Sequence, residues 1–97
     1  MPVKLILMKS PRHEKKFRIV WPDGGKVDFG AAGYEDYTIH NDPLRKERYI
    51  IRHQKRENWT DPRTAGFWSR WLLWNLPSLK QSVENIERRF GFKLTLL

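Results

Sequence analysis

Four arginines spaced three or four residues apart form the arrangement in this sequence that most resembles a binding site. Arg45, Arg48, Arg52 and Arg56 would share one side of an α-helix over about 16 Å, at a rise of 1.5 Å per residue. A guanidinium forms paired hydrogen bonds with phosphate or carboxylate oxygens, and Tyr49 beside the row offers a ring for stacking. These five residues therefore predict a site for a polyanion or an acidic partner.

A solvated helix face with partners inside the molecule explains the same arginines. Four carboxylates precede the row in the sequence and would be its internal partners: Asp23, Asp28, Glu35 and Asp36. Ion pairs with these carboxylates would leave little positive surface for another molecule. The sequence leaves both interpretations open.

Residue types that commonly carry catalysis or bind metals do not form a recognisable pattern. His13, His40 and His53 lack the spacing of a zinc site, and the glycines of residues 24–33 lack the Gly-Lys-Ser/Thr sequel of a phosphate-binding loop. The serines have no nucleophile-elbow surroundings. Cysteine is absent, which excludes thiolate metal sites and cysteine nucleophiles. We expect a protein that is not an enzyme and that uses no cofactor or metal.

Five tryptophans are a second unusual feature of a chain of 97 residues. Aromatic rings recur at helical spacing in the stretch FWSRWLLW, and each buries on the order of 200 Å² when it is enclosed. Such rings form either the centre of a small core or the anchors of a protein interface. Both roles stay open for the anchor candidates Trp59, Phe67, Trp68, Trp71 and Trp74.

The formal net charge of +8 is unevenly distributed along the chain. Residues 1–20 carry +5 and residues 43–56 carry +5, whereas residues 21–42 between them carry −4 and residues 57–97 carry +2. Such a distribution favours association with a polyanion or an acidic protein surface, although many basic proteins bind nothing specific.

The length indicates one compact domain over residues 1–97. The absence of cysteine fits a reducing compartment. The apolar run of residues 3–8 is too short for a secretory core and far below the roughly 20 residues that span a bilayer. We expect an intracellular product without membrane insertion.

Strand-like composition marks residues 3–8 and 17–21, and a charged stretch at 9–16 between them reads as a flexible loop. The turn sequence PDGG predicts a β-hairpin over 17–29, in which Phe17, Ile19 and Trp21 share one face. The tail FKLTLL has alternating character and is a candidate to pair with the first strand.

Three helices are expected from capping and periodicity. Asp42 and Pro43 begin one that runs to about Lys55, Thr64 caps one over 65–75, and Ser78 with Gln81 begins one that ends near Gly91. Periodicity places on the packed side of the first helix Leu44, Glu47, Ile50, Ile51 and Gln54. The fold class is α+β, an N-terminal β-hairpin with a small antiparallel sheet packed on about three α-helices.

Three stretches, FRIVWPDGGKVDFGAAGYEDYT, RYIIRHQKRENWT and TAGFWSRWLLWNLPSL, resemble a small uncharacterised family of basic proteins from large nucleocytoplasmic DNA viruses of algae and protists. The resemblance covers about residues 16–90. It includes the pattern RY..RH...ENW, from Arg48 to Trp59, and the pattern FWSRW..W, from Phe67 to Trp74. The family offers no active site, fold or ligand to carry over.

The resemblance implies a viral context, namely location in the virion or, during assembly, in the host cytoplasm or nucleus. One hypothesis is a minor capsid or virion-associated structural protein that bridges larger capsid proteins through the tryptophans and the arginine row. The other hypothesis is a nucleic-acid-binding protein without sequence specificity, in which the arginine row neutralises phosphates.

Overall fold

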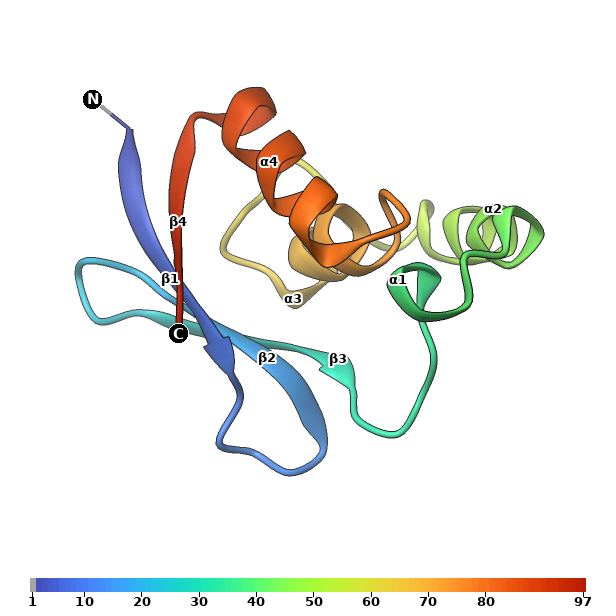
Figure 1. Ribbon diagram of the computed structural model, residues 1–97, viewed down its shortest axis with the longest axis horizontal. Coiled ribbons are helices and arrows are strands. Elements are labelled where there is room, and N and C mark those ends of the chain that lie inside the picture. Colours follow the sequence, from blue (N-terminus) through green and yellow to red (C-terminus); the bar gives the residue numbers. More distant parts are fainter. Residues whose placement is uncertain (1) are drawn as a thin grey trace.

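A four-stranded sheet with strand order β3-β2-β1-β4 forms one layer of the fold. The C-terminal helices lie against this sheet, whereas the first two helical segments extend to one side of it (Figure 1). The computed structural model describes residues 2–97. The strands are β1 (Val3–Lys9), β2 (Lys15–Val20), β3 (Lys26–Ala31) and β4 (Phe92–Leu96). The expected α+β class is confirmed, with the hairpin in the N-terminal third of the chain.

The predicted hairpin is formed by β2 and β3, which pair with Phe17 opposite Phe29 and Ile19 opposite Val27. Its turn is closed where the Trp21 N–H donates to the Gly25 carbonyl at 2.8 Å. Gly24 has a φ of +88°, a conformation that L side chains rarely adopt. The predicted PDGG turn is therefore present, and Gly24 is the glycine of this sequence that adopts a positive φ.

The two ends of the chain pair, which the sequence had raised as a candidate and left open. Strands β1 and β4 run parallel with Val3 opposite Phe92 and Leu7 opposite Leu96. The sheet is therefore mixed, where we expected antiparallel pairing throughout. A parallel pair needs a crossover connection, and the chain between β1 and β4 supplies one that contains all the helices. Residues 10–14 alone connect β1 to β2, so the loop predicted over 9–16 is shorter than expected.

Five helical segments follow the hairpin: α1 (Tyr37–His40), α2 (Pro43–His53), α3 (Ala65–Trp68), the π-helical turn η1 (Ser69–Leu73) and α4 (Leu79–Phe90). The predicted N-caps are confirmed. Asp42 accepts from the Leu44 N–H, Thr64 from the Phe67 N–H and Ser78 from the Gln81 N–H. Gly91 ends α4 in the left-handed conformation. None of the described helices is both long enough and apolar enough to span a bilayer.

The helix expected over 65–75 changes its hydrogen bonding after one turn. From Ser69 the chain forms a π-helical turn, in which the Trp74 N–H donates to the Ser69 carbonyl at 3.0 Å. The adjacent Leu72 and Leu73 of this turn are both buried. Turns of this kind are rare and occur frequently at functional sites.

The core lies between the sheet and the C-terminal helices. Leu5, Ile19 and Phe29 from the sheet are fully buried together with Phe67 and Trp68 from α3. Trp71 and Trp74 are partly buried and pack against this cluster. Phe67 and Trp68 are therefore core residues, which decides for these two the choice that the sequence left open.

The packed side of α2 differs from the expected one. Tyr49 is the buried residue of this helix, whereas Leu44 and Ile51 are 62% and 55% exposed. The physical reason is aromatic stacking, because the Tyr49 ring lies 4.5 Å from the Trp74 ring at an interplanar angle of 2°. The helix therefore packs through Tyr49, with Ile50 half-buried and Leu44 and Ile51 facing outward.

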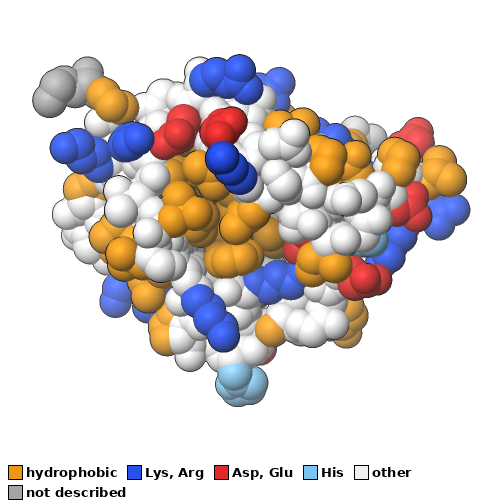
Figure 2. All heavy atoms as spheres, viewed as in Figure 1, with side chains coloured by type: hydrophobic (Ala, Val, Ile, Leu, Met, Phe, Trp, Pro, Cys, Tyr) orange, Lys and Arg blue, Asp and Glu red, His pale blue; other side chains and the backbone are white. Residues whose placement is uncertain are grey.

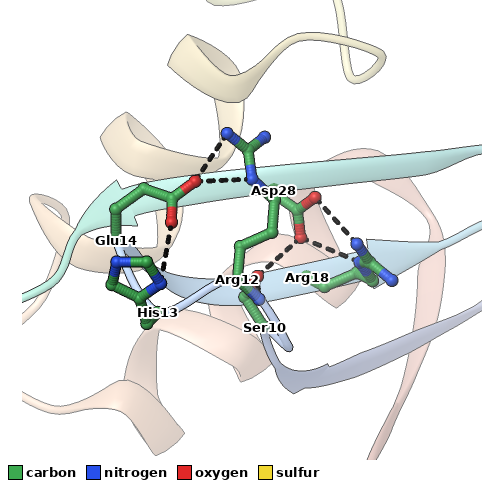
Figure 3. A network of polar contacts seen from close by, with 6 residues as sticks. All are labelled: Ser10, Arg12, His13, Glu14, Arg18 and Asp28. Carbon is green, nitrogen blue, oxygen red and sulfur yellow. Dashed lines mark hydrogen bonds and ion pairs between the residues drawn. The ribbon is translucent and has the colours of Figure 1, made fainter.

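A polar network ties the 10–14 loop to the hairpin (Figure 3). Asp28 on β3 accepts hydrogen bonds from Arg18 at 2.8 and 3.0 Å and from the Ser10 hydroxyl at 2.8 Å. Arg12 is paired with Glu14 in the same region at 2.6 Å. Bonding to Arg18, and then to Ser10, holds the pKa of Asp28 below its ordinary value of 3.8.

The lowered pKa of Asp28 predicts a specific loss of stability in acid. A carboxylate with a depressed folded-state pKa stabilises the fold above its unfolded-state pKa, and this contribution is lost as the pH falls through the folded value. Asp28→Asn is expected to lower the free energy of unfolding by about 1 kcal/mol at neutral pH, where Arg18 loses its ionic partner. The difference from the native chain should shrink below pH 3.8. Urea titrations at several pH values measure it, and a pH-independent difference would contradict the assignment.

Candidate polyanion-binding cleft

A cleft of about 600 Å³ separates α2 from the adjoining ends of β2 and β3 and from η1. Cationic side chains from two elements line it: Lys15 and Lys16 from β2, and Arg45, Arg48 and Arg52 from α2. Its volume lies in the usual range of ligand pockets. The cleft thus brings three of the four predicted arginines together with two lysines that are distant in sequence.

Two of these five cations are engaged by carboxylates of the same cleft. Arg45 pairs with the exposed Glu35 at 3.1 Å, and Lys16 pairs with the buried Asp36 at 2.6 Å. Within residues 2–97, Lys15, Arg48 and Arg52 have no ion pair. These three side chains, called here the free cations, keep their full charge available to another molecule.

The hairpin carboxylates that were candidate partners of the arginine row are occupied elsewhere. Asp23 pairs with Arg63 at 2.9 Å, and Asp28 pairs with Arg18 at 2.8 Å. Glu35 is therefore the one member of that acidic group that reaches the row. An internal carboxylate therefore pairs with Arg45, and the other arginines of the row have no ion pair within residues 2–97.

Arg56 departs from the predicted row. The helix ends at His53, and Arg56 lies in the following turn, where its N–H donates to the His53 carbonyl at 3.0 Å. It is exposed and does not line the cleft. The sequence pattern placed Arg56 on the helix, but the helix ends before this residue, at His53.

Tyr49 does not offer the stacking surface that was predicted for it. One face of its ring is covered by His53, with 4.3 Å between ring centroids, and the other by Trp74 at 4.5 Å. Burial, and then the nearby Glu57, raise the pKa of the phenol well above its ordinary value, so it stays protonated. Tyr49 therefore acts as a spacer that fixes α2 against η1.

Tyr34 is the exposed aromatic residue of the cleft. It follows β3, lines the cavity and is 73% exposed, so its ring faces are accessible to a ligand. Sequence reasoning missed Tyr34 and the two lysines of β2. The sequence around a charged residue at the end of a strand does not indicate which helix will lie opposite that residue in the fold.

Glu57 places an acidic side chain at the rim of the cleft. It accepts a hydrogen bond from Trp59 Nε1 at 2.9 Å and lies 3.4 Å from His53 Nδ1. A Cβ atom on Gly66 would come within 2.6 Å of this carboxylate, so a larger residue there would displace the Glu57 side chain. The pattern ENW thus has a structural explanation, in which Glu57 and Trp59 brace the end of α2.

Arg70 explains how the remaining tryptophans are held. Its guanidinium lies 4.4 Å from the Trp71 ring centre and 5.5 Å from that of Trp59, and it donates to the Trp74 carbonyl at 2.8 Å. Burial lowers its pKa. Trp71 Nε1 donates to the Trp59 carbonyl at 2.8 Å. The anchor candidates Trp59, Trp71 and Trp74 therefore form an internal scaffold behind the cleft.

A family model described as a family of unknown function (DUF5754) matches residues 5–53, just over half of the chain. The chain belongs to this family. No curated protein and no solved structure matches it.

The segment shared with the DUF5754 family runs from β1 to the end of α2. It contains all five cations of the cleft, whereas the tryptophan-rich scaffold lies outside it. Groups of three or more His, Asp or Glu side chains placed to hold a metal ion are absent from residues 2–97. The lining of the cleft combines its five cations with the carboxylates of Glu35, Asp36 and Glu57.

Proposed function

We propose that this chain is a nucleic-acid-binding protein without sequence specificity that binds phosphates in the cleft between β2 and α2. The observation that carries the proposal is the position of the free cations, with Lys15 on one wall and Arg48 and Arg52 on the other. Phosphate groups repeat along a nucleic acid, so one strand could satisfy cations on both walls.

The electrostatics of the chain support this proposal over binding of a single small anion. The free cations add to a net charge of +8, which attracts an extended polyanion from a distance. Figure 2 shows Lys and Arg side chains around a central hydrophobic area and a mixed acidic and basic group at the α2 end of this face. The arrangement provides phosphate contacts and no evident set of groups for reading base edges.

A salt titration tests the proposal. Affinity for a mixed-sequence oligonucleotide is measured by fluorescence anisotropy, and the logarithm of the binding constant should fall linearly with that of the salt concentration. Each phosphate contact should contribute about 0.9 to the slope on duplex DNA and about 0.7 on a single strand. A polyglutamate chain serves as an acidic-protein control. Stronger binding to polyglutamate than to the oligonucleotide would overturn the proposal.

A second candidate function is a virion-associated protein that bridges larger capsid proteins. The observation that favours it is the outward apolar side of α2, where Leu44 and Ile51 are 62% and 55% exposed. Leu44 and Ile51 lie two turns apart on one side of the helix, so a single partner surface would cover both of them.

Co-sedimentation with virus particles after salt extraction tests this second candidate. The native chain should remain with the particles, and the double variant Leu44→Asp and Ile51→Asp should be released, because charge at an apolar contact opposes burial. Leu96→Asp is a control at another exposed aliphatic residue. Release of the native chain before the shell is disrupted would refute the bridging role.

A further inference from the structure

A second cleft, of about 730 Å³, adjoins the first on the side of the 10–14 loop. The two cavities share Lys15, Lys16 and Asp36 as lining residues, so they meet at the start of β2. A polymer bound by the free cations therefore has a direct continuation into the second cleft.

The lining of the second cleft combines apolar surface with positive charge. Pro11, Phe17, Ile39 and Leu79 supply the apolar part, and Ile39 is 57% exposed. Lys9 stands at its edge and, like Lys15, has no ion pair within residues 2–97. The cavity thus offers apolar contact beside groups that bind phosphate.

Negative charge around the second cleft is already neutralised. Asp36, its one acidic lining residue, is bonded to Lys16 at 2.6 Å and to the Thr38 hydroxyl and N–H. Arg12 at the rim is occupied by Glu14 at 2.6 Å. The remaining electrostatic field therefore comes from Lys9 and Lys15. This field favours a polyanion with regularly repeated charges over a neutral peptide or an acidic peptide whose charges are irregularly spaced.

We propose that the ligand of the two clefts is single-stranded nucleic acid, with phosphates on the free cations and unpaired bases against the apolar lining of the second cleft and the Tyr34 ring. This inference rests on the proposed function and specifies its substrate. Bases in a duplex are stacked inside and cannot lie on an apolar protein surface, whereas those of a single strand expose their faces. The phosphate contacts also come from a concave site, not from a projecting helix that enters a major groove.

Oligonucleotides of one sequence in three forms test the inference: a single strand, the matching duplex and a single strand with abasic sites throughout. The complete single strand should bind the native chain about tenfold more tightly than the abasic strand, since base stacking on protein surfaces contributes on this scale. It should also bind more tightly than the duplex. Tyr34→Ala should weaken binding of the complete strand severalfold and leave the abasic strand unaffected.

A pair of isoleucine variants locates the bases. Ile39→Asp places a carboxylate in the second cleft, and Ile51→Asp makes the same change at an equally exposed position on α2 outside both clefts. The first should weaken single-strand binding at least tenfold and the second much less. Equal binding of the complete, abasic and duplex forms would overturn the inference and leave the proposed function standing. Absence of binding to all three would overturn both.

Discussion

Replacing Lys15, Arg48 and Arg52 together by Gln should lower the affinity for single-stranded nucleic acid about a hundredfold at about 0.1 M salt. Each phosphate contact contributes about 0.7 to the salt slope on a single strand, so the slope should fall by about two. The three side chains line one cleft from two elements and lack internal partners in the described chain. Anisotropy titrations at several salt concentrations give both quantities.

A matched variant separates the cleft from the total charge. Arg56, Lys80 and Arg88 are exposed, lie outside the first cleft and provide the same two arginines and one lysine. Their replacement by Gln changes the net charge by the same amount, so a weak long-range effect is expected and most of the affinity should remain. Equal losses in the two triple variants would show that charge alone, and not the cleft, binds the ligand.

Replacing Trp68 by Ala should destabilise the fold by about 4 kcal/mol, the cost typical of removing a fully enclosed large aromatic residue. The Trp68 side chain is completely buried, lies 6.3 Å from the Phe29 ring centre and 5.9 Å from that of Phe92, and donates to the Pro62 carbonyl at 2.7 Å. It therefore connects α3 to both edges of the sheet. Urea denaturation followed by circular dichroism measures the change.

Two further substitutions control for this effect. Ile51→Ala removes an exposed aliphatic residue from α2 and should alter the free energy of unfolding by less than about 0.5 kcal/mol. Trp68→Phe keeps a ring and loses the hydrogen bond to Pro62, so an intermediate cost is expected. A cost below about 0.5 kcal/mol for Trp68→Ala would contradict the core role, since a loss of that size is typical of an exposed position.

Local chemistry made much of the fold predictable. Turns and helix caps depend on a few neighbouring residues. The structure contains the predicted turn over residues 22–25, the caps at Asp42, Thr64 and Ser78, and the helix end at Gly91. The arginine spacing was also sufficient to place Arg45, Arg48 and Arg52 on one side of α2, because the rise and twist of a helix are fixed.

Helical periodicity failed where one long-range contact was stronger than the average pattern. It assigned Leu44 and Ile51 to the packed side of α2, yet the stack of Tyr49 between Trp74 and His53 turns the helix the other way. The change from α to π hydrogen bonding at Ser69 was equally unpredictable, because it depends on burying Leu72 and Leu73 against a surface built by other elements.

The sequence by itself determined the hairpin, the starts of three helices, the positive charge and the row of arginines on one helix, since these follow from residues close together in the chain. Tertiary structure decided which cations share a cleft, because Lys15 and Arg48 line one cavity only after Tyr49 of α2 has stacked on Trp74. It also decided which charges stay unpaired. An ion pair is a property of two positions in space, and no spacing along the chain specifies that Asp36 is bonded to Lys16 and that Arg52 is left free.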